Sequence, residues 1–267
     1  MASESRGRIR LTIQYDGSGF HGWQVQPGVR TVQGELDSAL SRLADRPITT
    51  TAAGRTDAGV HATGQVVGVE MPAKWTPAAL RESLNAILPG DVWAAAAEPA
   101  PPTFHARYGA LARGYIYRVG TAESALSPFR RRWCWPVRDD LERATLDAAA
   151  AGLVGQHSFR GYAKSGQPER GYRCTVYAAR WTDWRAGGFE FRITANRFLH
   201  HMVRYLVGTM VDAARGRRPA GDVLALLDEP GGLETSPPAP AEGLFLARVY
   251  YSEDELNSEG PVNEDLP

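Results

Sequence analysis

Residues 54–61, Gly-Arg-Thr-Asp-Ala-Gly-Val-His, hold the densest group of side chains that could do chemistry. Asp57 could act as a nucleophile or a base, and Arg55, two residues away, would keep its carboxylate ionised. An aspartate before Ala-Gly is also typical of a plain turn, which is the structural alternative. His61 adds a conceivable metal ligand, but transition-metal sites usually draw on more ligands than this pair.

Residues 196–204, Asn-Arg-Phe-Leu-His-His-Met-Val-Arg, form a second polar group within a helix expected over 198–215. That helix is apolar on nearly all sides, so Arg204 needs a carboxylate or phosphate partner unless it extends to the surface. His200 and His201 invite a metal, but neighbours on a helix point about 100° apart and do not easily serve one ion. We therefore expect no metal site.

Arginine and aromatic residues occur together twice more. Residues 127–137 place three consecutive arginines among aromatic side chains, and Arg113 shortly precedes Tyr115 and Tyr117. Such surfaces suit unstacked RNA bases and phosphates. The alternative is that the rings pack on a sheet and the arginines are ordinary surface charge.

Composition sets the class of protein. The chain has 267 residues, of which 43% are hydrophobic and 22% charged, as in a globular protein of one large or two ordinary domains. Two cysteines exclude a disulfide scaffold and favour the cytoplasm. No apolar run approaches the ~20 residues of a membrane helix, and the N-terminus does not read as a signal peptide, so we expect no membrane contact.

The zero net charge conceals an asymmetry. Residues 253–267 contain six acids and no base, which leaves 30 basic against 24 acidic residues in 1–252. Of the basic residues 28 are arginine, the side chain better suited to bidentate phosphate contacts, although codon bias with a solvated surface would give the same count. The acidic tail is poor in apolar residues and is expected to be disordered.

The first half of the chain alternates strands and helices. Strands are expected at 8–15, 48–53, 65–71 and 91–98. Helices should begin at the capping residues Thr31 and Thr76, the latter followed by a proline at the first helical position. The order β-α-β-β-α-β is the split βαβ order of a ferredoxin-like unit, here an N-terminal catalytic lobe over 8–110.

The second half, 111–252, should form a C-terminal lobe that completes the cleft. We expect strands at 112–121 and 244–251, a hairpin of 174–184 with 189–194, and helices at 141–153, 198–215 and 221–227. The fold class is therefore α/β, of the α+β type.

Several of these segments resemble the TruA family of tRNA pseudouridine synthases, over roughly residues 8–251. The resemblance is carried by 15–24 (YDGSGFHGWQ) with 31–33, by 54–61 (GRTDAGVH), by 104–107 (FHAR) with 113–117, by 195–204, and by 242–244. It implies the pseudouridine synthase fold, with two ferredoxin-like or RRM-like lobes around a mixed, mainly antiparallel sheet. It also implies a homodimer that converts uridine to pseudouridine at positions 38, 39 and 40 of the tRNA anticodon stem-loop, with no cofactor and no metal.

The resemblance assigns roles to individual residues. Asp57 becomes the nucleophile, Arg204 its ion-pair partner, Arg55 the arginine that assists base flipping, and Tyr115 the residue that stacks on the target base. Further substrate-binding residues are Arg107, Arg113 and Leu244. The chain departs from the family pattern at Gly114, Ser158 and Cys174 and in its acidic tail, which bears on RNA contacts rather than on the chemistry.

Two other functions remain open at this point. The chain could be a catalytically silent RNA-binding module on the same fold. It could also be a metal-dependent hydrolase that uses Asp57, His61 and His200. A dinucleotide-binding protein is not expected, because the Gly-x-Gly-x-x-Gly of residues 17–22 precedes a loop rather than opening a helix.

Overall fold

The computed structural model describes residues 6–164, 171–228 and 231–258. The chain divides into two compact units. The first contains the residues up to Leu111 together with those from Leu246 onward, and the second runs from Ala112 to Phe245. In this division the last strand lies mostly in the first unit. The expected lobes, 8–110 and 111–252, remain predictions.

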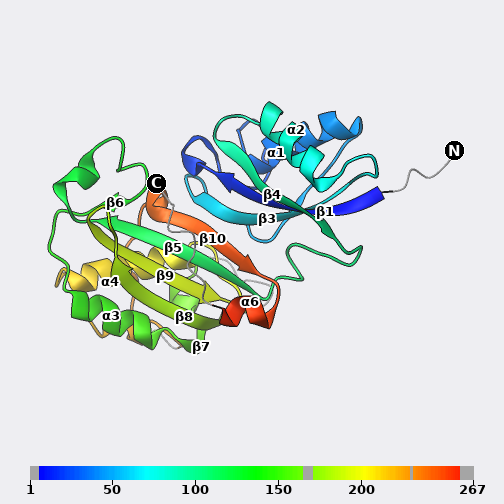
Figure 1. Ribbon diagram of the computed structural model, residues 1–267. Helices are drawn as coiled ribbons and strands as arrows, with labels where there is room; N and C mark the ends of the chain where they lie inside the picture. Colours follow the sequence, from blue (N-terminus) through cyan, green and yellow to red (C-terminus); the bar gives the residue numbers. More distant parts are fainter. Residues whose placement is uncertain (1–5, 165–170, 229–230, 259–267) are drawn as a thin grey trace. The chain divides into compact units, whose positions relative to one another are not determined.

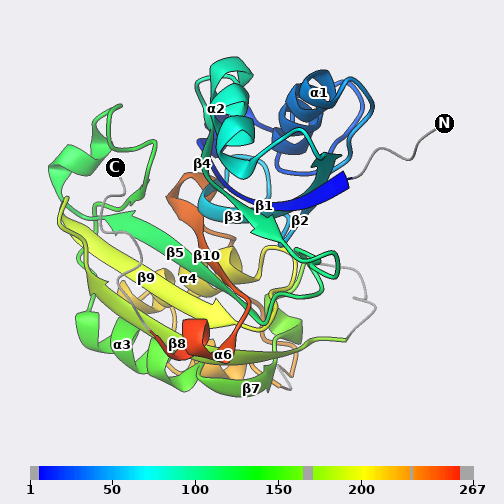
Figure 2. The ribbon, with the colours of Figure 1, turned by 45° about the vertical axis from the view of Figure 1, so that its right-hand side comes forward.

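The first unit is built on an antiparallel sheet. Strand β1 (Arg6–Tyr15) lies between β4 (Val92–Ala100) and β3 (His61–Pro72), and the two-residue β2 (Thr51–Ala52) pairs with β3. Helices α1 (Val32–Ala44) and α2 (Pro77–Ile87) lie on one face of these strands (Figures 1 and 2). The leucines that face this layer, Leu11, Leu36, Leu40, Leu80 and Leu84, are fully buried. The other face of the strands carries the polar residues of β1.

Both helices of this unit begin where their caps predict. The Thr31 hydroxyl accepts from the N–H of Gly34, and the Thr76 hydroxyl accepts from that of Ala79. Each cap satisfies one of the N–H groups that the first helical turn leaves unpaired. The β-α-β-β-α-β order is confirmed, although the strand expected over 48–53 is reduced to β2.

The second unit has its own layer of strands and helices. Its strands β5 (Ala112–Gly120), β9 (Gly188–Ala195), β8 (Arg173–Asp183) and β7 (Gly155–Ser158) are antiparallel neighbours in that order. The short β6 (Trp135–Pro136) pairs in parallel with β5. Helix α3 (Arg143–Gly152) packs against β8 and α4 (Met202–Ala214), and α4 packs against α5 (Asp222–Ala225). The fold class is confirmed: a mixed α/β protein with a large, mainly antiparallel sheet.

Helix α4 begins four residues later than expected. His201 has φ 64°, in the left-handed region, and the helix starts at the next residue. His200 and His201 therefore precede the helix, with ring centroids 4.2 Å apart. The argument that helical geometry separates these two rings was wrong.

The chain ends differently from expectation. Strand β10 (Leu244–Tyr250) is followed by a short helix α6 (Glu253–Asn257), whereas disorder was expected from residue 253. The Ser252 hydroxyl accepts from the N–H of Glu255, and the Glu255 carboxylate accepts from the N–H of Tyr251. This arrangement is close to a capping box, and acidic side chains in the first turn complement the helix dipole. Residues 259–267 lie outside the described part of the chain.

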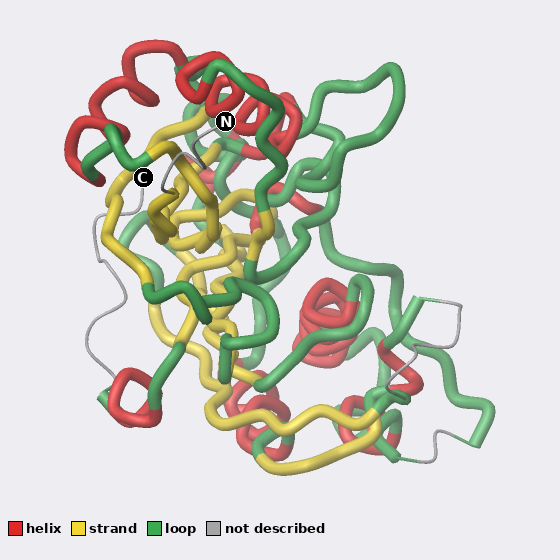
Figure 3. Tube along the Cα trace, turned by 90° about the vertical axis from the view of Figure 1, so that its right-hand side faces the viewer, coloured by secondary structure: helices red, strands yellow, loops and turns green. Residues whose placement is uncertain are grey.

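Loops make up much of what remains, as the green segments of Figure 3 show. Short 3₁₀ turns occur within them at Gly17–Gly19, Glu123–Leu126, Arg160–Tyr162 and Ala241–Gly243. Among the described residues, no helix has both the length and the apolar character needed to cross a membrane.

Candidate active site

The backbone at Asp57 packs directly against the segment around Gly22. A Cβ atom on Gly22 would lie 2.7 Å from the Thr56 carbonyl oxygen and 3.1 Å from the Asp57 carbonyl carbon. Gly22 also has φ 89°, which glycine adopts without cost. The next residue, Trp23, donates its N–H to the Thr56 carbonyl at 3.0 Å. The loop that carries Asp57 therefore rests on residues 22 and 23.

A second close approach lies on the other side of Asp57. A Cβ on Gly17 would come within 2.0 Å of the Val60 carbonyl oxygen, and the Gly59 N–H donates to the Phe20 carbonyl at 3.3 Å. Residues 15–24 and 54–61, far apart in the sequence, thus form one packed structure. Gly17 and Gly22 have no side chains, and this leaves room for the backbone of residues 56–60.

Buried polar side chains support the loop from behind. The hydroxyls of Tyr15 and Thr56 are 2.8 Å apart, and the Gln65 amide donates to the Gly54 carbonyl at 2.6 Å. Burial raises the pKa of Tyr15 despite its hydrogen bonds, so its hydroxyl stays neutral. Sequence reasoning missed Gln65; the signal was an amide directly before the apolar pair Val66-Val67 in a predicted strand, since a buried polar group needs a defined partner.

His61 belongs to the same framework. It is 1% exposed, and its Nδ1 lies 3.0 Å from the Gly17 nitrogen and 3.3 Å from an oxygen of Asp16. When Nδ1 carries a proton it donates to Asp16, the bond that helps to lower the pKa of Asp16, and when it carries none it accepts from the Gly17 N–H. In either state Nδ1 has a partner within the loop, which gives His61 a structural role.

Asp16 is held ionised in this environment. Burial alone would raise the pKa of its carboxyl group, but hydrogen bonds from His61 and from the N–H and hydroxyl of Ser18 outweigh burial and hold the pKa below its ordinary value.

The side chains of the loop differ in exposure. Thr56 is buried, Asp57 is half-buried and Arg55 is exposed. Asp57 does form a turn, as its structural alternative predicted, but the turn bond runs from the Val60 N–H to the main-chain carbonyl of Asp57. That bond does not require the carboxylate.

In the second unit, Tyr115 and Arg113 face the segment that leads into α4. The Tyr115 ring meets the Phe198 ring edge-on, with centroids 4.9 Å apart, and Tyr115 is 9% exposed. Two residues earlier on the same side of β5, Arg113 donates to the Asn196 carbonyl at 3.1 Å. The Asn196 side chain in turn accepts from the Thr175 N–H at 3.0 Å. Asn196 is a positioning residue for which the sequence reasoning had no role.

Arg204 lies in the first turn of α4 and is half-buried. Its Nε donates to the Ala239 carbonyl at 2.7 Å, and the Ala239 N–H donates back to the Arg204 carbonyl at 2.9 Å. The Tyr117 hydroxyl donates to the Pro240 carbonyl at 2.8 Å. Burial raises the pKa of Tyr117, and the positive charge of Arg204 opposes this shift only in part. These bonds fix residues 239–240 against both β5 and α4.

The segment that follows contacts the same tyrosine. A Cβ on Gly243 would lie 2.7 Å from the Tyr117 ring, so glycine allows the chain to pass there. Leu244 is the next residue; it begins β10 and is 5% exposed.

The predicted residues are thus divided between the units. The first contains Arg55, Asp57 and Arg107, and the second contains Arg113, Tyr115, Arg204 and Leu244. Arg55 and Asp57 share one loop, whereas Arg107 is an exposed residue beyond β4 whose guanidinium lies 5.5 Å from the Tyr108 ring centroid.

Comparison with known proteins finds relatives over most of the chain. The family model described as "tRNA pseudouridine synthase" matches residues 11–109 and 149–252. A protein of Chlorobium phaeovibrioides is 41% identical over 244 residues, covering 91% of this chain and 99% of its own length. A protein of Moorella thermoacetica is 41% identical over 246 residues, and one of Bacillus subtilis is 38% identical over 247 residues. Each match covers 91% of this chain and 99% of the relative. All three are named tRNA pseudouridine synthase A.

Proposed function

Because this chain belongs to the tRNA pseudouridine synthase family, whose members are isomerases, we propose that it converts uridine to pseudouridine at positions 38, 39 and 40 of the tRNA anticodon stem-loop. The observation that carries the proposal is the loop of Asp57, held between two glycine contacts with its carboxylate half-buried and Arg55 exposed beside it. A rigid support for one carboxylate is what a nucleophile or a base requires.

The reaction is an isomerisation and needs no oxidant. The bond between the ribose carbon and the uracil nitrogen breaks, the uracil turns, and a bond forms from the same ribose carbon to a ring carbon. The proton displaced from that ring carbon is balanced by the proton gained at the nitrogen. The Asp57 carboxylate either attacks the sugar or removes a proton from it, and both routes require the ionised form.

The target uridine has to leave its stack before it can react. Flipping a nucleotide costs a few kcal/mol, which binding must offset. In our proposal Arg55 assists the flip, and Tyr115 stacks on the extruded base, its own ring already fixed edge-on by Phe198. Arg204 is the ion-pair partner of Asp57. Arg107, Arg113 and Leu244 contact the RNA.

We further propose that the protein works as a homodimer in the cytoplasm. An anticodon arm needs a surface on its flank as well as at the reacting base, and a second subunit would supply that surface. Light scattering at micromolar concentration should give the dimer mass. A fully active monomer would contradict this part of the proposal.

The test of the reaction is to incubate unmodified tRNA with the protein and map pseudouridines along the anticodon arm. We expect them at positions 38, 39 and 40. Tight binding of tRNA with no product would favour the silent RNA-binding module. Activity that EDTA abolishes and zinc restores would favour the metal-dependent hydrolase with Asp57, His61 and His200.

A further inference from the structure

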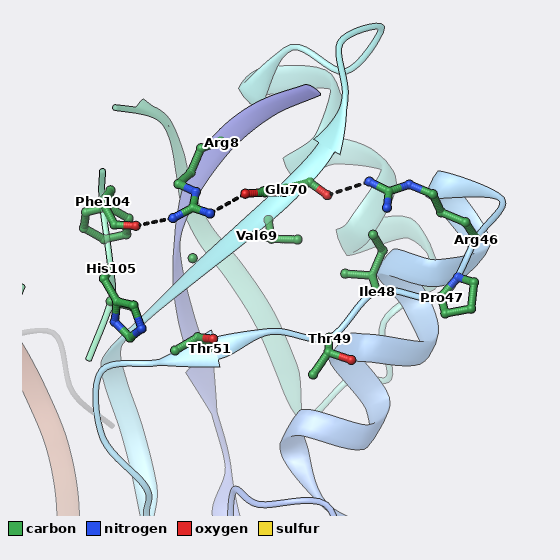
Figure 4. Close-up of a pocket in the computed structure, with 12 residues that line it drawn as sticks. Arg8, Arg46, Pro47, Ile48, Thr49, Thr51, Val69, Glu70, Phe104 and His105 are labelled. Atoms are coloured by element: carbon green, nitrogen blue, oxygen red, sulfur yellow. Dashed lines mark hydrogen bonds and ion pairs between the residues drawn. The ribbon is translucent and has the colours of Figure 1, made fainter. Parts of the chain in front are cut away.

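The first unit contains a pocket of about 250 Å³ that the proposed reaction does not use. Figure 4 shows its wall: Arg8 and Glu70 on neighbouring strands, Arg46 beyond the end of α1, Thr49 and Thr51 on the chain into β2, and His105 on the far side. All of these residues belong to the same unit.

The two arginines of the pocket differ in how far they are neutralised. Arg8 forms an ion pair with Glu70 and donates to the Phe104 carbonyl at 2.6 Å. Arg46 donates to the main-chain carbonyl of Glu70 at 3.2 Å. In the described part of the chain no carboxylate forms an ion pair with Arg46. The pocket therefore carries a net positive charge, which comes from Arg46.

The other polar groups of the wall include several donors. His105 accepts at Nδ1 from the N–H groups of Arg107 and Tyr108, at 3.2 and 3.1 Å, so the neutral ring carries its proton on Nε2. Thr49 and Thr51 are exposed and offer hydroxyls. An arginine fork with further N–H and O–H donors matches the oxygens of a phosphate group.

The volume narrows the choice of ligand. Sites for drug-sized ligands occupy roughly 300–1,000 Å³, so this pocket suits a smaller group such as a phosphate with part of its ribose. None of its lining residues belongs to the reacting loop, and the nearest in sequence, Thr51, lies three residues before Gly54. Gly68, at the pocket, is seven residues along β3 from His61, which corresponds to about 23 Å at ~3.3 Å per residue.

From these features we infer that the pocket binds a phosphate of the tRNA backbone, as a second anchor remote from the reacting uridine. This inference rests on the proposed function, because it assumes that tRNA is the substrate. Glu70 limits the affinity of the site: its carboxylate holds Arg8 and repels the ligand, so Glu70→Gln makes the site bind more tightly.

The test compares Arg46→Ala with Arg42→Ala, an exposed arginine of α1 that does not line the pocket. The dissociation constant for tRNA is measured as a function of salt. Arg46→Ala should weaken binding about tenfold, since hydrogen bonds to charged groups are among the stronger ones. It should also reduce the slope of log K against log salt by about 0.7–0.9, the share of one phosphate. Arg42→Ala should bind like the wild type, and Glu70→Gln should bind more tightly.

Equal affinities for Arg46→Ala and Arg42→Ala would overturn the inference. A second arm follows the His105 ring by NMR. At saturating tRNA its signals should shift less in Arg46→Ala than in the wild type; equal shifts would count against the inference. If uridine monophosphate shifts them while Arg46→Ala leaves tRNA affinity unchanged, the pocket is a site for free nucleotide and the inference is overturned.

The outcome is separable from that of the proposed function. Single-turnover conversion at saturating tRNA should be the same in Arg46→Ala and wild type, because the pocket does not touch the reacting base. If the wild type makes no pseudouridine while Arg46→Ala still weakens tRNA binding, the proposed function is wrong and the inference that the pocket binds a tRNA phosphate is supported.

Discussion

Gly22 and Thr56 approach so closely that a Cβ on Gly22 would lie 2.7 Å from the Thr56 carbonyl oxygen. The contact joins two segments more than thirty residues apart and sets the backbone of the residue after Thr56, which is Asp57. A side chain at position 22 must push this loop away or distort its own backbone.

Gly22→Ala is therefore expected to lower both stability and turnover. Overpacking costs typically about 1–3 kcal/mol, and displacement of Asp57 should reduce the single-turnover rate by about 100-fold. The matched control is Gly28→Ala, because Gly28 also has positive φ, 76°, but no atom within 4 Å of the added Cβ. Gly28→Ala shares the backbone strain and lacks the clash. If the two variants lose the same stability and activity, the close contact is not what positions Asp57.

The lowered pKa of Asp16 makes a prediction about pH. A carboxylate with a folded-state pKa below its ordinary value of 3.8 stabilises the fold above that pH, and this contribution is lost as the pH falls below it. Asp16→Asn should thus have a lower free energy of unfolding than the wild type from pH 5 to 7. This difference should shrink as the pH falls below about 4. Urea unfolding across this range measures it. A gap that widens on acidification would contradict the assignment.

Tyr115 has two roles that substitution can separate. Tyr115→Phe keeps the ring that packs edge-on against Phe198, so folding and tRNA binding should match wild type, and turnover should fall only if the hydroxyl takes part in proton transfer. Tyr115→Ala removes the stacking surface, worth about 1–3 kcal/mol per base, and should lose turnover. Melting temperatures are measured alongside, because Tyr115→Ala also leaves a cavity. Near-wild-type rates for Tyr115→Ala would remove this residue from the site.

Local signals explain which parts of the fold the sequence predicts. Thr31 and the Thr76-Pro77 pair mark helix starts because a cap acts within one turn, and both starts are confirmed. The start of α4 was misplaced because the apolar pattern continues through His201, whose left-handed backbone no periodicity reveals. Helix α6 was not predicted because the tail is acidic and poor in apolar residues, which indicates disorder, whereas Ser252 caps a helix there.

In the site, too, short motifs could be recognised in the sequence, whereas contacts between distant segments could not. The motif at 54–61 draws attention to Asp57 and Arg55 by residue type alone. Its support does not follow from any short pattern, since the contacts to Gly17, Gly22 and Gln65 depend on the register of the folded chain. The phosphate pocket draws on four separate segments of the chain and is likewise visible only in the structure.

The most direct test of the account is the yield of pseudouridine from Asp57→Asn, mapped on unmodified tRNA beside the wild type. Asparagine keeps nearly the shape and turn preference of aspartate but supplies no carboxylate. We predict that the variant folds, binds tRNA with wild-type affinity and forms no pseudouridine at any position, while the wild type modifies positions 38, 39 and 40. Wild-type turnover by Asp57→Asn would contradict the account.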